Sequence, residues 1–201
     1  ISASINVEMV DLSGREKGSA AVDESQRSPT RINHIASLLP APLASILSWN
    51  LRKAPKLRER WTEVIGASDA VFIGGGQLLM DNSLLFPLRI AEVVRICKTQ
   101  GVPVHFLACG VGSRWTLIGK RLVRGAIGAS SSLTVRDSAS KQNLRQVIAS
   151  DPVGVSVIGD PGLFSCEAYC IDRAVDGTNN IGLGITAKSE VLKRAPKYKD
   201  V

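Results

Sequence analysis

Three consecutive glycines, Gly74, Gly75 and Gly76, follow the apolar residues 70–73. A short apolar run that ends in glycine is typical of a buried strand followed by a tight turn. Because such a turn lacks Cβ atoms, its backbone N–H groups can approach an anion closely at the ligand-binding edge of a parallel sheet. The glycines therefore indicate a phosphate or carboxylate site, although a purely structural turn explains them equally well at this point.

An arginine and two aspartates follow two further apolar segments. Arg136 and Asp137 come directly after residues 133–135, and Asp160 follows residues 153–158 and precedes a proline. The planar guanidinium of arginine can grip a carboxylate or phosphate through two hydrogen bonds. Asp137 stands where a helix N-cap belongs, so we expect it to cap the helix or position Arg136 rather than act as an acid or base. For Asp160, orientation of a sugar hydroxyl and formation of a turn both stay open.

A second glycine turn, Gly110-Val111-Gly112, ends the apolar run 102–109. We expect it to offer backbone donors as the first turn does, although two glycines around one valine are weak evidence alone. The carboxyl ends of parallel strands meet at one edge of a sheet, where ligands bind. The residues predicted to bind substrate there are Gly74, Gly75, Gly76, Gly110, Gly112, Arg136, Asp137 and Asp160. No catalytic residue, metal ligand or cofactor is predicted.

The spacing after the first glycine turn argues against two familiar nucleotide sites. Gly74-Gly75-Gly76 is not followed by the spacing of a dinucleotide fingerprint, and no Walker-type lysine comes after it. No acidic residue stands where a ribose partner belongs. A simple NAD or ATP site is therefore disfavoured.

The elements that must position these residues alternate between strand and helix. Period-3.6 apolar spacing predicts helices, and short apolar runs that end in turn residues predict strands. The expected strands are residues 70–73, 102–109, 133–135 and 153–158, and the expected helices are 87–100, 118–126 and 144–148. This order predicts an α/β fold with a mostly parallel sheet. His105 lies inside a predicted strand, so we interpret it as a hydrogen-bonded core histidine rather than a catalytic one.

The N-terminal third of the chain is less regular. Apolar alternation predicts a strand over residues 5–12, and the polar, small residues 13–29 predict a mobile loop. A helical pattern begins at Arg31, and the stretch 52–60 that follows it is rich in Lys and Arg before Trp61. We favour a solvated helix face for this basic stretch, with contact to an anionic membrane surface as the alternative.

Composition narrows the class of protein. The 201 residues are 44% hydrophobic and 21% charged, as in an ordinary globular chain with a core, and carry a formal net charge of +7. This charge favours an acidic small molecule, an anionic lipid surface or nucleic acid as the partner. The aromatic content of 4% argues against a base-stacking platform, so we predict no nucleic acid. We find no signal peptide and no apolar run near the length of a membrane span.

The four cysteines lack the paired C-x-x-C spacing of a zinc site, and each lies in an apolar segment. They are Cys97, Cys109, Cys166 and Cys170. We therefore expect buried, reduced thiols and a cytosolic protein.

Taken together, these segments resemble the polysaccharide pyruvyl transferase family. The resemblance covers about half of the chain and rests on the order and spacing of four motifs, which are Val71 to Leu79, Gly101 to Gly112, Thr134 to Asp137 with Ser140 and Leu144, and Gly159-Asp160-Pro161. It implies two Rossmann-like domains arranged as in GT-B glycosyltransferases, with the active site in the cleft between them. On this comparison, residues 1–171 form the N-terminal Rossmann-like domain, 172–179 a linker, and 180–201 the start of a truncated second domain.

Two departures from the family pattern matter. Family members open with a strand that leads into an Asn-x-Gly-Asp turn, and no such turn precedes Ile5, which leaves open whether the first strand is present. The family's second domain supplies a histidine and basic residues to the donor site, and this chain ends before that domain is built. Neither His34 nor His105 matches the position of that histidine, so no catalytic histidine is assigned.

The resemblance implies a reaction in which phosphoenolpyruvate gives its carboxyvinyl skeleton to two hydroxyls of one sugar, forming a pyruvate ketal. The implied acceptor is a sugar or lipid-linked oligosaccharide of a cell-surface polysaccharide precursor. The implied place of action is the cytoplasm, with peripheral contact to the inner face of the membrane as an option. We expect these 201 residues alone to be inactive. Two alternatives stay open: a GT-B-like glycosyltransferase that uses a nucleotide sugar, and a non-catalytic glycan-assembly module on the same scaffold.

Overall fold

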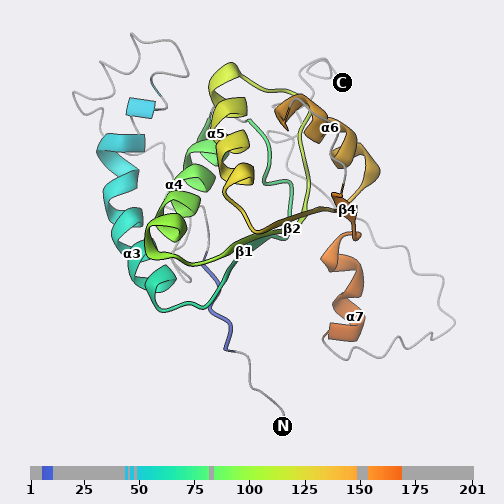
Figure 1. Cartoon of the computed structure of the whole chain (residues 1–201), viewed down its shortest axis with the longest axis horizontal. Helices are drawn as coiled ribbons and strands as arrows, with labels where there is room; N and C mark the ends of the chain where they lie inside the picture. Colours follow the sequence, from blue (N-terminus) through green and yellow to red (C-terminus); the bar gives the residue numbers. More distant parts are fainter. Residues whose placement is uncertain are drawn as a thin grey trace, which may run out of the picture. The chain divides into compact units, whose positions relative to one another are not determined.

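A computed structural model of the chain describes residues 6–10, 44, 46–47, 49–81, 84–148 and 154–168. Within them lies a parallel sheet of four strands, β1 (Val71–Gly74), β2 (Val104–Cys109), β3 (Ser132–Val135) and β4 (Ser156–Val157). The strands are ordered β1-β2-β3-β4, and every neighbouring pair is parallel. The predicted α/β class with a parallel, Rossmann-like sheet is confirmed (Figure 1).

Three helices connect the strands, namely α4 (Leu85–Gln100), α5 (Leu117–Gly128) and α6 (Ser138–Ile148). Each strand pairs with the next one along the chain, so every crossover steps across the sheet in the same direction. Right-handed crossovers that all step one way leave their helices on one face of the sheet. Figure 1 shows α4, α5 and α6 on the same side of the strands.

The core lies between these helices and the sheet. Alternate strand residues point to this side, and Ile73, Phe106 and Val135 are at most 4% exposed. They belong to one buried cluster with apolar residues of the helices, such as Ile90 of α4 and Leu144 of α6. Each such side chain stabilises the fold by about 1.5 to 3 kcal/mol when it is fully buried. The helices therefore cover the face of the sheet that carries Ile73, Phe106 and Val135.

The opposite face carries a row of side chains that are at least partly exposed. Phe72, His105 and Ser132 lie side by side on β1, β2 and β3. The Phe72 ring is stacked on the His105 ring with centroids 5.1 Å apart, and His105 Nδ1 lies 2.9 Å from Ser132 Oγ. His105 is thus hydrogen-bonded as predicted, but its predicted place in the core is wrong. It lies on the face turned away from α4 and α5, because its position in the strand is one residue out of phase with buried Phe106.

A π-helical turn, η2 (Trp49–Lys53), leads into helix α3 (Ala54–Gly66), which packs beside α4. Trp49 and Trp61 are buried, and their ring centroids lie 6.2 Å apart. Arg58 from the basic stretch forms an ion pair with Glu92 of α4, whose side chain is only 10% exposed. Burial acts to raise the pKa of Glu92, but hydrogen bonds from Arg95 and Arg58 outweigh it and leave this pKa below its ordinary value. Part of the basic stretch therefore stabilises helix packing, and its contact with a membrane stays a prediction.

Several predictions away from the central βαβ units differ from the structure or lie outside the described residues. Residues 6–10 belong to no strand, so this part of the predicted strand 5–12 is wrong, and Val7 and Met9 are both mostly exposed. The alternation of apolar residues in 5–12 predicted a half-buried strand, but among the described residues β2 is the only strand that pairs with β1, and no strand pairs with residues 6–10. Strand β4 is shorter than predicted, and residue 153 lies outside the described residues. Most of the predicted loop and helix within 13–48 also lies outside them.

The chain divides into two compact units, residues 1–165 and 166–201. The first unit includes the 3-10 turn η3 (Pro161–Phe164), and the helical turn α7 (Ser165–Ala168) begins at its last residue. The predicted linker 172–179 and the predicted start of a second domain at residue 180 lie outside the described residues. The GT-B-like arrangement stays a prediction.

Candidate functional site

The predicted site residues lie at or after the carboxyl ends of the four strands. Gly75 and Gly76 follow β1, Gly110 follows β2, Arg136 follows β3, and Asp160 follows β4 after a short connection. The first two segments are joined by backbone hydrogen bonds, because the Gly110 N–H donates to the Gly76 carbonyl at 2.9 Å and the Leu79 N–H donates to the Gly110 carbonyl at 3.2 Å. The sheet therefore brings together groups that lie far apart in the sequence.

The first glycine turn combines a structural glycine with unused backbone donors. A Cβ at Gly74 would overlap the carbonyl oxygen of Leu107, so only glycine fits there. Gly75 has a φ of 82°, a left-handed conformation that favours glycine, and a Cβ at Gly75 or Gly76 would meet no atom within 4 Å. The N–H groups of Gly75, Gly76 and Gln77 donate to no other described residue. This turn can therefore offer its N–H groups to an anion.

The second glycine turn offers no such donors, which corrects the prediction. The N–H of Gly110 bonds to Gly76, that of Val111 donates to Ser140 Oγ at 3.0 Å, and that of Gly112 donates to the Leu79 carbonyl at 2.7 Å. The N–H groups of Gly110 and Gly112 hold the segment after β1 against the end of β2, and that of Val111 joins the turn to α6. Glycines in a sequence indicate that backbone N–H groups are accessible, but not whether the fold already uses these groups in hydrogen bonds of its own.

Gly110 instead makes room for Arg136. A Cβ at Gly110 would lie 2.9 Å from Arg136 Nε, closer than real Cβ contacts come, and 3.0 Å from Gln77 Cα, which is a tight contact. The guanidinium thus lies against the backbone of Gly110, on the same side as the turn that follows β1. Gly112 is packed closely too, because its Cβ would lie 3.2 Å from Met80 Cβ.

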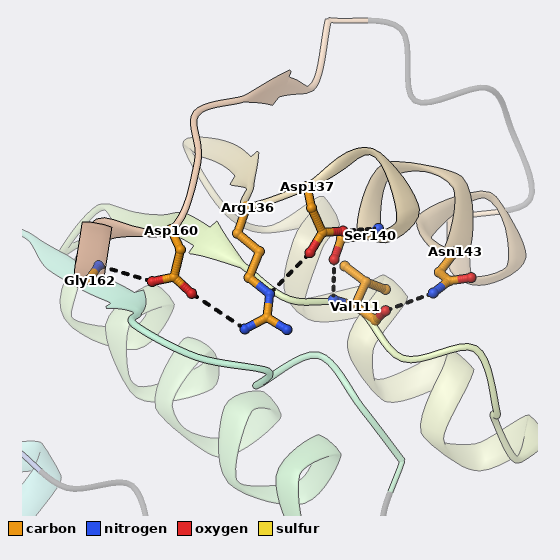
Figure 2. A network of polar contacts seen from close by, with 7 residues as sticks. All are labelled: Val111, Arg136, Asp137, Ser140, Asn143, Asp160 and Gly162. Atoms are coloured by element: carbon orange, nitrogen blue, oxygen red, sulfur yellow. Dashed lines mark hydrogen bonds and ion pairs between the residues drawn. The ribbon is translucent and has the colours of Figure 1, made fainter. Parts of the chain in front are cut away.

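Arg136 is held between two carboxylates (Figure 2). Its Nε donates to Asp137 Oδ2 at 3.2 Å, and its Nη1 lies 3.6 Å from Asp160 Oδ2. The other oxygen of each carboxylate accepts a backbone N–H, from Ser140 at 2.6 Å and from Gly162 at 3.0 Å. The Arg136 side chain stays 29% exposed. One cation is therefore fixed at the edge of the sheet and is still open to solvent.

Asp137 caps helix α6, as the sequence predicted. The hydrogen bond from the Ser140 N–H holds the pKa of the Asp137 carboxyl below its ordinary value, and the nearby Arg136 guanidinium acts in the same direction. Such a carboxylate is ionised at neutral pH and makes a poor proton donor. The arrangement agrees with the predicted role of Asp137 in capping and in positioning Arg136.

Asp160 caps the turn η3, with Pro161 in the position after the cap. Its extended backbone, with φ of −83° and ψ of 123°, suits the residue before a proline. The turn-forming role that the sequence left open is thus present in the structure. A role toward a sugar hydroxyl stays a prediction.

Asp81 is a positioning residue that the sequence analysis did not select. Its Oδ2 accepts hydrogen bonds from the Thr116 N–H at 2.7 Å and from Thr116 Oγ1 at 2.6 Å, and its Oδ1 accepts from the Leu84 N–H at 3.1 Å. Asp81 thereby fastens the segment after the first glycine turn to the start of α5. The local signal was an aspartate shortly before a predicted helix, but its main partner lies 35 residues further along the chain.

Ser140 and Asn143 hold the second glycine turn from the α6 side (Figure 2). The Ser140 hydroxyl is buried and accepts the Val111 N–H, while Asn143 Nδ2 donates to the Val111 carbonyl at 2.9 Å. The sequence analysis expected Ser140 to complete the start of its own helix. Its backbone N–H does so through Asp137, but its hydroxyl serves the neighbouring turn.

Two of the cysteines are buried thiols, as expected. Burial raises the pKa of Cys97 to about 11 and that of Cys109 to about 12, so neither is a thiolate at neutral pH. Cys109 ends β2 and donates a weak hydrogen bond to the Ile73 carbonyl at 3.2 Å. These two cysteines therefore pack the sheet and do not act as nucleophiles. Nothing is assigned to the side chains of Cys166 and Cys170, which lie outside the described side chains.

No group of three or more His, Cys, Asp and Glu residues in the described part of the chain is arranged to hold a metal ion. Within the same residues, no helix has both the length and the apolar content needed to cross a membrane.

The fold and this edge of the sheet define a Rossmann-like α/β protein with a candidate anion site at the carboxyl ends of its strands. The family model of polysaccharide pyruvyl transferase matches residues 19–196, which is most of the chain. The chain belongs to this family, and the suspected resemblance is confirmed. Comparisons with curated proteins and with solved structures gave no match.

Proposed function

We propose that this protein is a pyruvyl transferase that forms a pyruvate ketal on a sugar of a cell-surface polysaccharide precursor, with phosphoenolpyruvate as donor. Family membership supports a transferase of polysaccharide biosynthesis. The observation that carries the choice of donor is that a partly exposed guanidinium and unused backbone N–H groups lie at the same end of the sheet. A Cβ added to Gly110 would lie 2.9 Å from Arg136 Nε and 3.0 Å from Gln77 Cα, so the guanidinium lies near the backbone of the first glycine turn. A small polyanion fits such a combination.

The reaction explains why the donor needs this environment. Protonation of the methylene carbon of phosphoenolpyruvate makes its central carbon an electrophile, and one sugar hydroxyl adds to it. The second hydroxyl then displaces the phosphate at the same carbon, so that one donor and one diol give one ketal and one inorganic phosphate. Negative charge builds up on the leaving phosphate, where fixed N–H donors and a cation stabilise it. Arg136 and the N–H groups of residues 75–77 are our candidates for this stabilisation.

The remaining predicted residues have supporting roles in this proposal. Gly74 and Gly110 shape the backbone around the donor, Asp137 positions Arg136, and Asp160 is a candidate to orient a hydroxyl of the acceptor. The acid that protonates the methylene carbon is not assigned. We propose a sugar or lipid-linked oligosaccharide as acceptor, in the cytoplasm or at the inner face of the membrane.

Calorimetric titration of the full-length protein with phosphoenolpyruvate and with nucleotide sugars tests the proposal. We expect saturable binding of phosphoenolpyruvate and its loss when Arg136 is replaced by alanine. Binding of a nucleotide sugar in its place would favour the glycosyltransferase alternative. Binding of neither donor would favour a non-catalytic glycan-assembly module. Ketal formation on a sugar acceptor, measured as pyruvate released by mild acid, then identifies the reaction.

A further inference from the structure

We propose that Asp160 is an exchangeable counter-ion of Arg136, which an incoming anion displaces from the guanidinium. The inference rests on the proposed function, because it concerns the same anion site. It gives Asp160 a defined role in the affinity of that site, in addition to its role in the turn η3.

The two carboxylates on Arg136 are not equivalent. Asp137 is the next residue in the chain, contacts Nε at 3.2 Å and is fixed by a hydrogen bond of 2.6 Å from the Ser140 N–H. Asp160 comes from the segment after β4, lies 3.6 Å from Nη1, and its side chain is 48% exposed. An ion pair of that length and exposure is weak. Asp137 therefore sets the orientation of the guanidinium, and Asp160 is the contact that can be given up.

Asp160 also has a partner of its own. Its Oδ1 accepts the Gly162 N–H at 3.0 Å, and only its Oδ2 faces Arg136. When Arg136 turns to another anion, the Asp160 carboxylate keeps this backbone hydrogen bond and gains solvent. The exchange therefore leaves no buried charge without a partner.

An anion can make a bidentate contact with Arg136 only if Asp160 gives up its place on the guanidinium. A guanidinium holds a phosphate or carboxylate through two adjacent nitrogen atoms. Nε of Arg136 is taken by Asp137, so the adjacent pair that remains is Nη1 and Nη2, and Asp160 lies on Nη1. The cluster of Arg136, Asp137 and Asp160 has a formal charge of −1, from one cation and two carboxylates, which repels an anion as long as both carboxylates stay close. A bound anion therefore competes with Asp160 for the same nitrogen.

The test compares anion binding by the wild-type protein and by Asp160→Asn. The asparagine Oδ1 still accepts the Gly162 N–H, so the cap is kept while the charge is lost. Asp160→Ser is the second variant, because its hydroxyl also caps the turn and carries no charge. The matched control is Asp69→Asn, which removes the same charge from an exposed residue just before β1, at the amino end of this strand and away from the site. Inorganic phosphate and phosphoenolpyruvate serve as probes, in titrations at low and high salt.

We expect Asp160→Asn and Asp160→Ser to bind both anions about 3- to 10-fold more tightly at low salt, with a smaller gain at high salt because screening weakens the removed repulsion. Asp69→Asn should bind as the wild type does. Weaker binding by both Asp160 variants would show that Asp160 positions Arg136 and would overturn the inference, as would unchanged binding. In either case, binding by the wild type would leave the proposed function standing. Absence of anion binding by the wild type and all variants would instead refute the anion site itself, and with it this inference.

Discussion

Replacement of Arg136 is the most direct test of the proposed donor site. A charge-assisted hydrogen bond to a bound anion contributes about 1.5 to 3 kcal/mol, which corresponds to about 10- to 150-fold in affinity. In Arg136→Ala the two carboxylates that faced the guanidinium stay behind and repel the donor, at about 1 kcal/mol per charge pair 4 Å apart in water. We therefore expect phosphoenolpyruvate to bind about 100-fold more weakly.

The same reasoning predicts a graded series. Arg136→Lys keeps one positive charge but cannot reach two acceptors at once, so its affinity should fall between those of the wild type and Arg136→Ala. Adding Asp160→Asn to Arg136→Ala should recover part of the loss, because one repelling charge is gone. Arg60→Ala, at an exposed position of α3, is the control for loss of one positive charge.

In the full-length protein, binding is measured by calorimetry and turnover by ketal formation, with thermal melting as a check on folding. The ion pairs of Arg136 are partly exposed and contribute little to stability, so the melting temperature should change by only a few degrees. Unchanged affinity and turnover in folded Arg136→Ala would remove Arg136 from the site and refute the reasoning.

Three further predictions follow from the geometry. Gly75→Val and Gly101→Val both place a side chain at a positive φ, 82° and 73°, with no atom within 4 Å of the new Cβ. Both variants should therefore lose about 1 to 2 kcal/mol of stability, but only Gly75→Val, which lies at the site, should weaken donor binding. Equal weakening of donor binding in both variants would contradict a donor role for this turn. The pKa of Asp137 is lowered in the folded state, so its negative charge stabilises the fold. This contribution to the free energy of unfolding is complete above the ordinary carboxyl pKa of about 3.9 and is lost as the pH falls through the pKa of the folded state. Urea unfolding should therefore show wild type more stable than Asp137→Asn at pH 7, with the difference vanishing at lower pH, and a difference that grows on acidification would have the wrong sign. Asp81→Ala leaves two backbone N–H groups without their acceptor and should cost about 1 to 3 kcal/mol in urea unfolding, while an unchanged midpoint would show that Asp81 does not fasten this segment.

The sequence predicted the βαβ units well because their signals are local. Helix α4 ends at Gly101 in a left-handed conformation, as a glycine after a periodic apolar segment predicts. Strands β1, β2 and β3 were recognised from short apolar runs that end in turn residues. The cap on α6 was recognised from Asp137 for the same reason, since a cap depends on the next few residues only.

The errors concern interactions between segments far apart in the chain. Apolar strands of a parallel sheet carry no simple alternation, so the sequence did not show that His105 faces away from the helices. The register between β2 and β3 shifts after Phe106, where Ala108 adopts a φ of 49° and its N–H donates to the Thr134 hydroxyl. An alanine gives no signal for such a conformation, because only its pairing with β3 requires it. Asp81 was missed for a similar reason, as Thr116 is remote in the sequence.

The second glycine turn shows how a motif can matter for a different physical reason than the expected one. Its N–H groups are all used within the protein, so Gly110 contributes through the side chain that it lacks. Because β2 lies between β1 and β3, Arg136 must pass over the end of β2 to approach the turn after β1. A Cβ at Gly110 would come within 2.9 Å of Arg136 Nε, so the guanidinium would have to shift. The order of the strands therefore turns two separate motifs, a glycine turn and an arginine, into parts of one candidate anion site.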